Sequence, residues 1–281
     1  TNDEFTNSEI LEETYNLIKN YSVNFKHIPV ITGFIAENKE GDITTLGRGG
    51  SDYSASIIGA ALDVDEIEIW TDVDGIKSAD PKIVKNAKQW DKVTFNEASE
   101  MAYFGAKVLH PKTIKPAINK KIPVRILNTY NIDNPGTVIE SEDDNECIFR
   151  VISSKRNITV VRICSTEMLH AYGFLAKIFE IFGKYKISVD IVSTSEVTVS
   201  VTLDNINGTS KNFEHAILEL RNIAKIEVLN ERAIVCITGK DIKNKPEILE
   251  RIFNIFKNIN VNTEIISQGV SPLSISFVVK Q

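Results

Sequence analysis

Residues 43–62 read ITTLGRGGSDYSASIIGAAL, which places a strand signal, a glycine-rich turn and a helix signal in direct succession. The first four residues are β-type, and the small residues from position 53 onward favour a helix. A glycine-rich turn at a helix start exposes backbone N–H groups beside the positive end of the helix dipole. The turn at 47–52 therefore predicts an anion-binding site. The alternative is a plain tight turn in which Ser51 caps the helix.

Two charged side chains extend what this turn could bind. Arg48 carries a planar guanidinium that can hold a carboxylate through two hydrogen bonds. Asp52 offers a carboxylate in the same place, where it could hold an ammonium group or a metal. The turn is neither a P-loop, because no Gly-Lys-Ser/Thr follows the glycines, nor the dinucleotide-binding G-x-G-x-x-G pattern. We therefore expect it to offer groups for both ends of an amino acid.

The composition restricts the function classes. The net charge of −6 over 281 residues argues against nucleic-acid binding, which needs a basic face. Cys147, Cys164 and Cys236 show no metal or redox spacing, so a reducing compartment is expected. No apolar run approaches the roughly 20 residues of a membrane span, and no signal peptide is recognisable. The chain begins without Met and stops after a strand-like run, so we interpret it as a piece of a longer protein.

The first half of the chain alternates helix and strand signals. A capping box, Thr94 with Glu97, predicts the start of a helix that extends to about residue 105. A buried strand is expected over 27–34. The other expected elements are strands at 43–46, 67–70 and 124–127 and helices at 8–21, 52–62 and 112–119. Alternation of this kind predicts an α/β layered domain with a largely parallel core.

An internal repeat follows a segment of turn residues and acidic linker at 131–146. The segments 177–182, 187–193 and 199–203 match 251–256, 261–267 and 273–277 in character, each 74 positions further along (253 − 179, 264 − 190 and 275 − 201). The strand-like residues 158–161 also match 233–236 in character, at a spacing of 75 (233 − 158). Each unit reads strand, helix, strand, strand, and the first continues with a helix at 213–222 and a strand at 226–230. That order is the ferredoxin-like βαββαβ unit.

Several motifs together identify a family. They are GRGGSD at 47–52, WTDVDGI at 70–76, ADP at 79–81 and FGAKVLHP at 104–111, followed by GFLA at 173–176, ISVD at 187–190 and TSEV at 194–197. On these motifs the chain resembles the monofunctional aspartate kinases from about residue 28 to its end. The resemblance implies the C-terminal part of an amino-acid-kinase (carbamate-kinase-like) α/β domain followed by two α+β ferredoxin-like ACT domains. The implied boundaries are a kinase part at 1–140, a linker and connecting strand at 141–156, a first ACT domain at 157–231 and an incomplete second one at 232–281.

The resemblance also implies a reaction. The family transfers a phosphoryl group from ATP with Mg²⁺ to the side-chain carboxylate of L-aspartate, giving 4-phospho-L-aspartate at the first step of lysine, threonine and methionine biosynthesis. The implied substrate-binding residues are Arg48, Gly49, Gly50, Ser51 and Asp52, of which Asp52 is also the candidate catalytic residue. The implied ATP-binding residues are Thr71, Asp72, Lys77, Lys82, Lys107 and Val108. No side-chain metal site is expected. Asp72 and Asp74 could instead be turn formers before Gly75, and Lys107 a solvated lysine at a helix end.

Two departures from the family pattern stand near the nucleotide residues. Lys77 occupies a position where relatives often carry an aromatic or apolar residue, and Lys82 stands where Arg is common. The lysine- and glycine-containing loop that holds the transferred phosphates is also not found in residues 1–26. We therefore expect this chain alone to have little or no kinase activity, although the full protein should have it. An ADP-release assay with aspartate tests this expectation.

The resemblance further implies feedback regulation, with lysine as the expected effector and S-adenosylmethionine as an alternative, in a homodimer or larger assembly formed through the ACT domains. The residues that match the lysine pocket are Met168, Ala171, Gly173, Phe174, Leu175, Ser188, Val189, Asp190, Thr194 and Glu196. Asp190 and Glu196 would supply negative charge for ammonium groups, and backbone N–H groups near Gly173 would take the carboxylate. The alternative is that Asp190 is a loop-end residue and Glu196 a surface residue.

Two other functions stay open. The chain could be a non-catalytic amino-acid-sensing regulatory chain. It could also be a kinase of the same fold that acts on glutamate or acetylglutamate, although the tandem repeat argues against this. Neither a nucleic acid nor a membrane is expected as a partner. The expected location is the cytoplasm or, alternatively, the plastid stroma.

Overall fold

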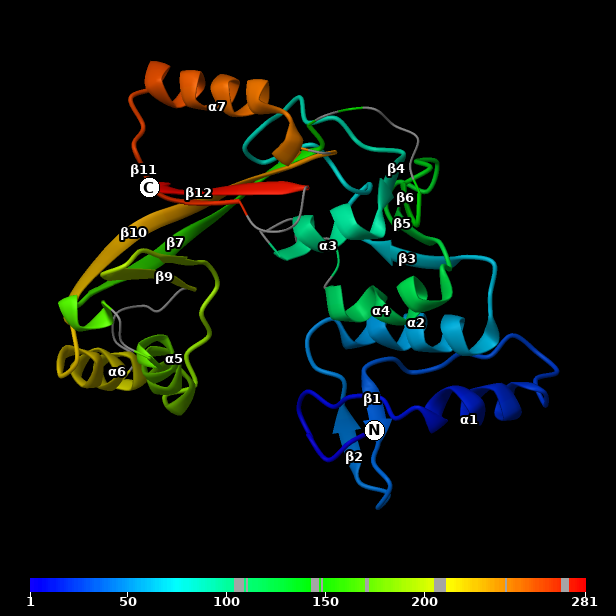
Figure 1. Cartoon of the computed structure of the whole chain (residues 1–281). Coiled ribbons are helices and arrows are strands. Elements are labelled where there is room, and N and C mark those ends of the chain that lie inside the picture. Colours follow the sequence, from blue (N-terminus) through cyan, green and yellow to red (C-terminus); the bar gives the residue numbers. More distant parts are fainter. Residues whose placement is uncertain are drawn as a thin grey trace. The chain divides into compact units, whose positions relative to one another are not determined.

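The computed structural model describes residues 1–103, 109, 111–142, 147, 149–169, 172–204, 211–240, 242–268 and 273–281. The chain divides into two compact units, unit 1 (Thr1–Val151) and unit 2 (Ile152–Gln281), drawn in Figure 1. Within the described ranges, no helix is both long and apolar enough to cross a membrane.

Unit 1 is built on a four-stranded sheet with the order β3-β5-β6-β4. Its strands are β3 (Ile67–Thr71), β4 (Lys92–Thr94), β5 (Val124–Asn128) and β6 (Thr137–Glu140). β3 pairs with β5 and β4 with β6 in parallel, whereas β5 and β6 are antiparallel. The remaining elements are the hairpin β1 (Ile35–Glu37) and β2 (Ile43–Thr45) and the helices α1 (Glu13–Ser22), α2 (Gly50–Leu62), α3 (Phe95–Tyr103) and α4 (Pro111–Lys120). The largely parallel core that the sequence predicts is therefore present, with one antiparallel step.

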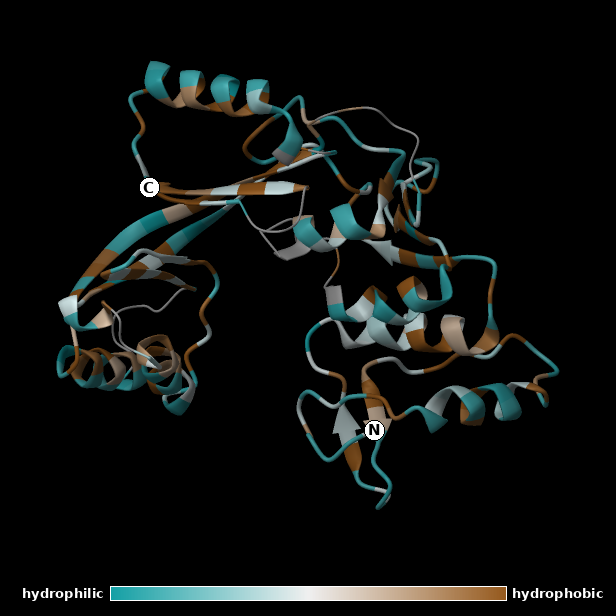
Figure 2. Ribbon diagram, viewed as in Figure 1, coloured by the Kyte–Doolittle hydropathy of each residue, from teal (hydrophilic) through white to brown (hydrophobic). Residues whose placement is uncertain are grey.

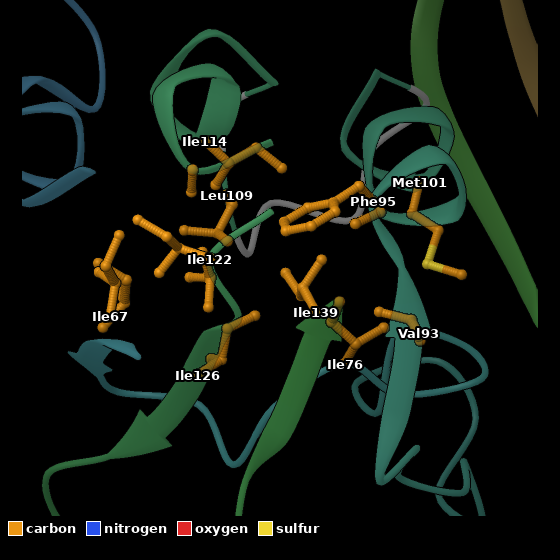
Figure 3. Close-up of a cluster of buried hydrophobic side chains, with 14 of the residues drawn as sticks. Ile67, Ile76, Val93, Phe95, Met101, Leu109, Ile114, Ile122, Ile126 and Ile139 are labelled. Carbon is orange, nitrogen blue, oxygen red and sulfur yellow. The ribbon is translucent and has the colours of Figure 1, made fainter. Parts of the chain in front are cut away.

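The core of unit 1 lies between this sheet and two of the helices. In Figure 3, Ile126 and Ile139 of neighbouring strands face Ile114 of α4 and Phe95 of α3. Ile126 and Ile139 are fully buried, so the aliphatic side chains of β5 and β6 form the centre of the cluster. Burial of this apolar surface holds the helices on the sheet.

The capping box at the start of α3 is confirmed. The Thr94 N–H donates to Glu97 Oε2 at 2.8 Å, and the Glu97 N–H donates to Thr94 Oγ1 at 3.2 Å. Two N–H groups that have no partner within the helix are thereby satisfied.

Other expected elements of unit 1 differ from the structure. The expected buried strand at 27–34 is wrong: the segment is irregular, and Val30 is 99% exposed. A strand needs a hydrogen-bonded neighbouring strand, and no strand of the described residues pairs with this segment. The expected turn and linker at 131–146 contains β6, an inner strand of the sheet. The first helix begins at Glu13 rather than at residue 8.

Unit 2 is built on a six-stranded sheet with the order β11-β12-β10-β7-β9-β8. Its strands are β7 (Val151–Cys164), β8 (Val192–Thr194), β9 (Thr198–Asp204), β10 (Lys225–Thr238), β11 (Thr263–Ser267) and β12 (Ser274–Lys280). The helices are α5 (Phe174–Lys184), α6 (Lys211–Arg221) and α7 (Pro246–Asn258), with the short 3-10 turns η1 (Thr166–Met168) and η2 (Ile242–Asn244).

The internal repeat is visible in the order of these elements. The first repeat runs β7-α5-β8-β9 and the second runs β10-α7-β11-β12, and in both the last strand pairs antiparallel with its neighbours. The strand expected at 226–230 is not a separate element. It is the first half of β10, which continues without a break into the first strand of the second repeat. The two repeats therefore share one sheet.

Each repeat covers its strands with its own helices. In the first repeat the fully buried Val161, Val201 and Leu203 pack with Ile178 of α5 and Leu220 of α6. In Figure 1, α5 and α6 lie near β9, and α7 lies near β12. Figure 2 shows hydrophobic residues along β12 and hydrophilic residues over much of the outer side of α7, as expected for an amphipathic helix.

Candidate functional site

The predicted anion-binding turn connects β2 to α2. Gly49 adopts the left-handed conformation with φ of 71° at the N-cap of α2, a backbone shape that glycine adopts without the steric cost of a Cβ. The Tyr53 N–H donates to the Gly49 carbonyl at 3.0 Å, which closes the first turn of the helix. The plain-turn alternative had Ser51 as the cap, but the N-cap is Gly49, two residues earlier, and no side chain caps the helix. The first N–H groups of α2 therefore stand at the turn without a side-chain acceptor.

The two charged residues of the turn are in different environments. Arg48 is exposed, whereas Asp52 is half-buried in the first turn of α2. Burial raises the pKa of the Asp52 carboxyl above its usual range. Within the described ranges, neither side chain forms an ion pair or a hydrogen bond. The site therefore presents a guanidinium and a carboxylate that are both available to a ligand with two opposite charges.

The predicted nucleotide residues Thr71 and Asp72 lie at the end of β3. Thr71 stands opposite Asn128 in the parallel pairing of β3 and β5, so both are at the carboxyl end of their strands. Figure 1 shows α2 and β3 running in opposite directions, which brings the N-terminus of α2 and the end of β3 towards the same side of unit 1. Ligands of open α/β sheets bind at that edge. The Thr71 hydroxyl donates to Asp72 Oδ1 at 3.2 Å.

The loop after β3 is held by Asp74, whose role in the site the sequence interpretation missed. Its Oδ1 accepts hydrogen bonds from Asn128 Nδ2 at 2.8 Å and from Asn131 Nδ2 at 3.2 Å, and its Oδ2 accepts one from Lys77 Nζ at 3.1 Å. The bonds from Asn128, Asn131 and Lys77 lower the pKa of the Asp74 carboxyl. The sequence identified Asp74 only as a possible turn former, because its partner Asn128 is 54 positions away.

Of the remaining predicted nucleotide residues, Lys77 and Lys82 lie within the described ranges. Lys77 is committed to an ion pair with Asp74, whereas Lys82 is exposed in a turn in which its N–H donates to Asp80 Oδ1 at 2.8 Å. Lys107 and Val108 lie outside the described residues.

The predicted effector residues surround the start of α5 and the strands next to it. Gly173 caps α5 in the left-handed conformation with φ of 78°, and no side chain caps this helix. Phe174 is buried in the core and Leu175 is partly exposed. Met168 and Val189 are half-buried, and Ser188, Thr194 and Glu196 are exposed. Ala171 lies outside the described residues.

Asp190 has a cationic partner that the sequence interpretation did not find. Lys155 of β7 places its Nζ 3.1 Å from Asp190 Oδ2, and it also forms an ion pair with Asp204 at the end of β9. Asp190 is therefore neither a bare loop-end residue nor a free anion. Its side chain is only 11% exposed, so the pair is largely removed from water.

A separate pocket of about 320 Å³ lies between α1, α2 and α4. Tyr15, Tyr53 and Lys112 contribute to its lining, but none of the described residues predicted for substrate or nucleotide does. The pocket is not part of the candidate site.

Comparison with known proteins assigns both units. Residues 1–128 match the amino acid kinase family, and residues 235–281 match an ACT domain. Aspartokinase 1, chloroplastic, of Arabidopsis thaliana is 45% identical, an alignment that covers 100% of this chain and 51% of the relative. The lysine-sensitive aspartokinase 3 of Escherichia coli is 39% identical over 89% of this chain and 56% of its own length. The chain thus spans about half the length of the curated relatives it matches.

Solved structures give the same assignment. Escherichia coli aspartokinase III in complex with aspartate and ADP superposes with a TM-score of 0.84 at 35% identity, covering 100% of this chain and 64% of that chain. The complex of the same protein with lysine and aspartate gives a TM-score of 0.83 at 36% identity, covering 100% of this chain and 63% of that chain. The fold class predicted from the sequence, part of an amino-acid-kinase domain followed by ACT domains, is confirmed. The chain belongs to the aspartokinase family.

Proposed function

We propose that the full-length protein transfers a phosphoryl group from ATP to the side-chain carboxylate of L-aspartate. The observation that carries the proposal is the turn at the start of α2, where Arg48 and Asp52 hold opposite charges and neither is engaged by a described side chain. An amino acid carries both charges and fits that arrangement. The aspartate and ADP bound to the related Escherichia coli enzyme support the same substrate pair.

Each residue of the turn has a proposed role. The Arg48 guanidinium pairs with a carboxylate of aspartate through two hydrogen bonds, and the Asp52 carboxylate holds the substrate ammonium. Gly49, Gly50 and Ser51 bring backbone N–H groups of the first turn of α2 to the bound anion. In the transfer, a side-chain oxygen of aspartate attacks the γ-phosphorus of ATP, and the bond to the ADP oxygen breaks. The side chains contribute position and charge, which phosphoryl transfer chiefly requires.

The nucleotide is proposed to lie at the carboxyl edge of the sheet. Thr71 and Asp72 end β3 there, and the proposal adds Lys82 and, outside the described residues, Lys107 and Val108. Lys77 would act indirectly, because it is paired with Asp74. Mg²⁺ is proposed to bind with ATP, since this ion prefers phosphate, water and carboxylate oxygens and neutralises phosphate charge.

Steady-state kinetics of the full-length protein test the substrate assignment. Arg48→Gln and Asp52→Asn should each raise KM for aspartate, lower kcat/KM for aspartate by about 100-fold or more and leave KM for ATP within about twofold. Lys85→Gln removes an exposed cation of unit 1 and serves as the control. Unchanged kinetics in Arg48→Gln would overturn the assignment. A full-length protein that binds amino acids but does not release ADP would be a sensing chain instead.

The first repeat is proposed to be the effector site, with lysine as the ligand. The uncapped start of α5 offers backbone N–H groups for a carboxylate, while Asp190 and Glu196 offer negative charge for ammonium groups. The lysine complex of the related Escherichia coli protein supports this choice. Calorimetry with lysine, threonine and S-adenosylmethionine tests it. Lysine should bind, and Asp190→Asn should weaken its binding at least tenfold, which corresponds to about 1.4 kcal/mol. Absence of lysine binding would refute the proposal.

Assembly and location are part of the same proposal. We infer a homodimer formed through the ACT domains, which light scattering of the full-length protein at several concentrations would test. The cysteines Cys147, Cys164 and Cys236 form no disulfide among the described residues, which fits the cytoplasm or the plastid stroma. Imaging of a tagged full-length protein would distinguish these compartments.

A further inference from the structure

Asp190 shares a single cation with a second carboxylate. Lys155 of β7 lies between Asp190, in the loop before β8, and Asp204, at the end of β9. The side chain of Asp190 is 11% exposed, that of Lys155 is 28% exposed and that of Asp204 is 45% exposed. The cluster therefore runs from a buried carboxylate, through the lysine, to a carboxylate at the surface.

The charges of this cluster do not balance. Burial and the neighbouring Asp204 raise the pKa of the Asp190 carboxyl, although Lys155 opposes this shift. Burial disfavours the Lys155 ammonium, but its hydrogen bonds to Asp204 and Asp190 outweigh burial and raise its pKa. With both carboxylates ionised, the cluster carries one excess negative charge. Asp190 therefore keeps an attraction for a further cation.

The second repeat shows a balanced version of the same arrangement. Glu264 occupies the position equivalent to Asp190 (264 − 190 = 74) and pairs with Arg232 of β10, whose Nε lies 2.8 Å from Glu264 Oε1. The position equivalent to Asp204 is Val278 (204 + 74), so the second carboxylate is missing there. In both repeats a cation from the first strand pairs with the acid at the equivalent position, but only the first repeat has a second carboxylate to hold that cation.

We propose that Lys155 is a built-in competitor for the effector: a ligand ammonium takes its place on Asp190 while Lys155 keeps its ion pair with Asp204. The inference rests on the effector site proposed above. The ligand class is a free amino acid whose side chain ends in a cation. Lys155 and Asp204 then set the affinity without touching the ligand, because the effector must compete with Lys155 and Asp204 stabilises the displaced lysine.

Calorimetry of the whole chain with L-lysine tests this exchange. Lys155→Gln removes the competitor and should tighten lysine binding by about tenfold, equivalent to 1.4 kcal/mol. Asp204→Asn removes the alternative partner of Lys155 and should weaken binding. Lys155→Arg keeps a cation and should not tighten it. Arg162 lies on β7, as Lys155 does, and Arg162→Gln, which breaks a surface ion pair with Glu227 of β10, should leave the affinity for lysine unchanged. L-Norleucine lacks the terminal ammonium, so its binding should not respond to Lys155→Gln.

The outcomes separate the two proposals. If the unaltered chain binds no lysine, the effector site and the competition both fail. If it binds lysine but Lys155→Gln weakens binding or leaves it unchanged, and Asp204→Asn has no effect, the effector site stands and the competition is wrong. Asp204→Asn changes the most exposed side chain of the cluster, at 45%, so it keeps the test valid even if Lys155→Gln impairs folding.

Discussion

Glu97 and Arg150 form a buried ion pair in which Arg150 Nε lies 3.1 Å from Glu97 Oε1, although 53 positions separate them. The other carboxylate oxygen of Glu97 caps the start of α3. The guanidinium of Arg150 stacks 4.8 Å from the Trp90 ring centre, and the Trp90 indole N–H donates to the Arg150 carbonyl at 2.8 Å. Arg150 directly precedes β7. One carboxylate therefore ties the start of α3 to the last residues of unit 1.

Removal of the Glu97 carboxylate should destabilise the folded chain. Glu97→Ala leaves the Arg150 guanidinium buried without its main counter-charge and removes a helix cap, so the free energy of unfolding should fall by about 3–5 kcal/mol. Urea unfolding of the whole chain, monitored by the fluorescence of Trp70 and Trp90 in unit 1, measures this loss. The double variant Glu97→Ala, Arg150→Met should lose less than the sum of the two single variants. Asn96→Ala, at an exposed position of the same helix turn, is the control. Additive losses would mean that the two side chains do not interact.

The stability contributed by Asp74 should depend on pH. Its pKa is lowered in the folded state by hydrogen bonds from Asn128, Asn131 and Lys77. Its contribution is therefore fully present above the unfolded value of about 3.9 and is lost as the pH falls through the lower folded value. Asp74→Asn should lower the free energy of unfolding by about 1–3 kcal/mol at pH 7. The difference from the unaltered chain should shrink in acid.

Urea unfolding across a pH series measures the effect of Asp74→Asn. Asp65→Asn changes an exposed carboxylate and should reproduce the profile of the unaltered chain. A difference between Asp74→Asn and the unaltered chain that stayed constant from neutral to acidic pH would contradict the role given to this carboxylate.

At Gly136, directly before β6, the backbone passes close to the backbone of β5. Its φ is 73°, and a Cβ at this position would overlap the carbonyl oxygen of Ile126, a backbone atom in β5. Gly136→Ala should therefore displace β6 and destabilise unit 1 by more than the roughly 1–2 kcal/mol that left-handed backbone alone costs. Gly173 has a similar φ of 78°, but a Cβ there would meet nothing within 4 Å. Gly173→Ala should therefore lose only the free energy that the left-handed backbone costs. Equal losses in thermal unfolding would argue against the overlap.

Thr202 positions the segment that carries Asp190. It is fully buried on β9, and its hydroxyl oxygen accepts a hydrogen bond from the Ile191 N–H at 2.8 Å. Thr202→Val keeps the shape but leaves that N–H without its acceptor, at a cost of about 1–3 kcal/mol. Unfolding measurements should show the loss, and lysine binding should weaken with it. Thr202→Ser keeps the hydroxyl and should restore lysine binding. Equal lysine binding by the unaltered chain, Thr202→Val and Thr202→Ser would show that Thr202 does not position the effector site.

Features held by neighbouring residues were predictable from the sequence. The capping box needs only Thr94 and Glu97, three positions apart, and the start of α2 follows from the glycines before it. The repeat was visible because the same side-chain pattern recurs at a constant spacing. Each of these signals lies within one element or recurs regularly, so it does not depend on what packs against it.

Whether a segment became a strand was decided by its partners. The apolar residues at 27–34 have the composition of a buried strand, yet they pair with no described strand and stay exposed. Residues 137–140 lie among turn and acidic residues, yet they pair on both sides as β6. Hydrogen bonds between strands join residues far apart in sequence, so local composition does not encode them.

The sequence by itself determined the family, the α/β and ferredoxin-like classes and the charged turn that the proposed aspartate site uses. Only the tertiary structure decided which of those charges are free. Arg48 and Asp52 are left unpaired within the described residues, Lys77 is committed to Asp74, and Asp190 shares Lys155 with Asp204. The physical reason is that an ion pair depends on distance in space and on burial. Lys155 and Asp190 come within 3.1 Å only because β7 and β8, the strand that follows Asp190, belong to one sheet.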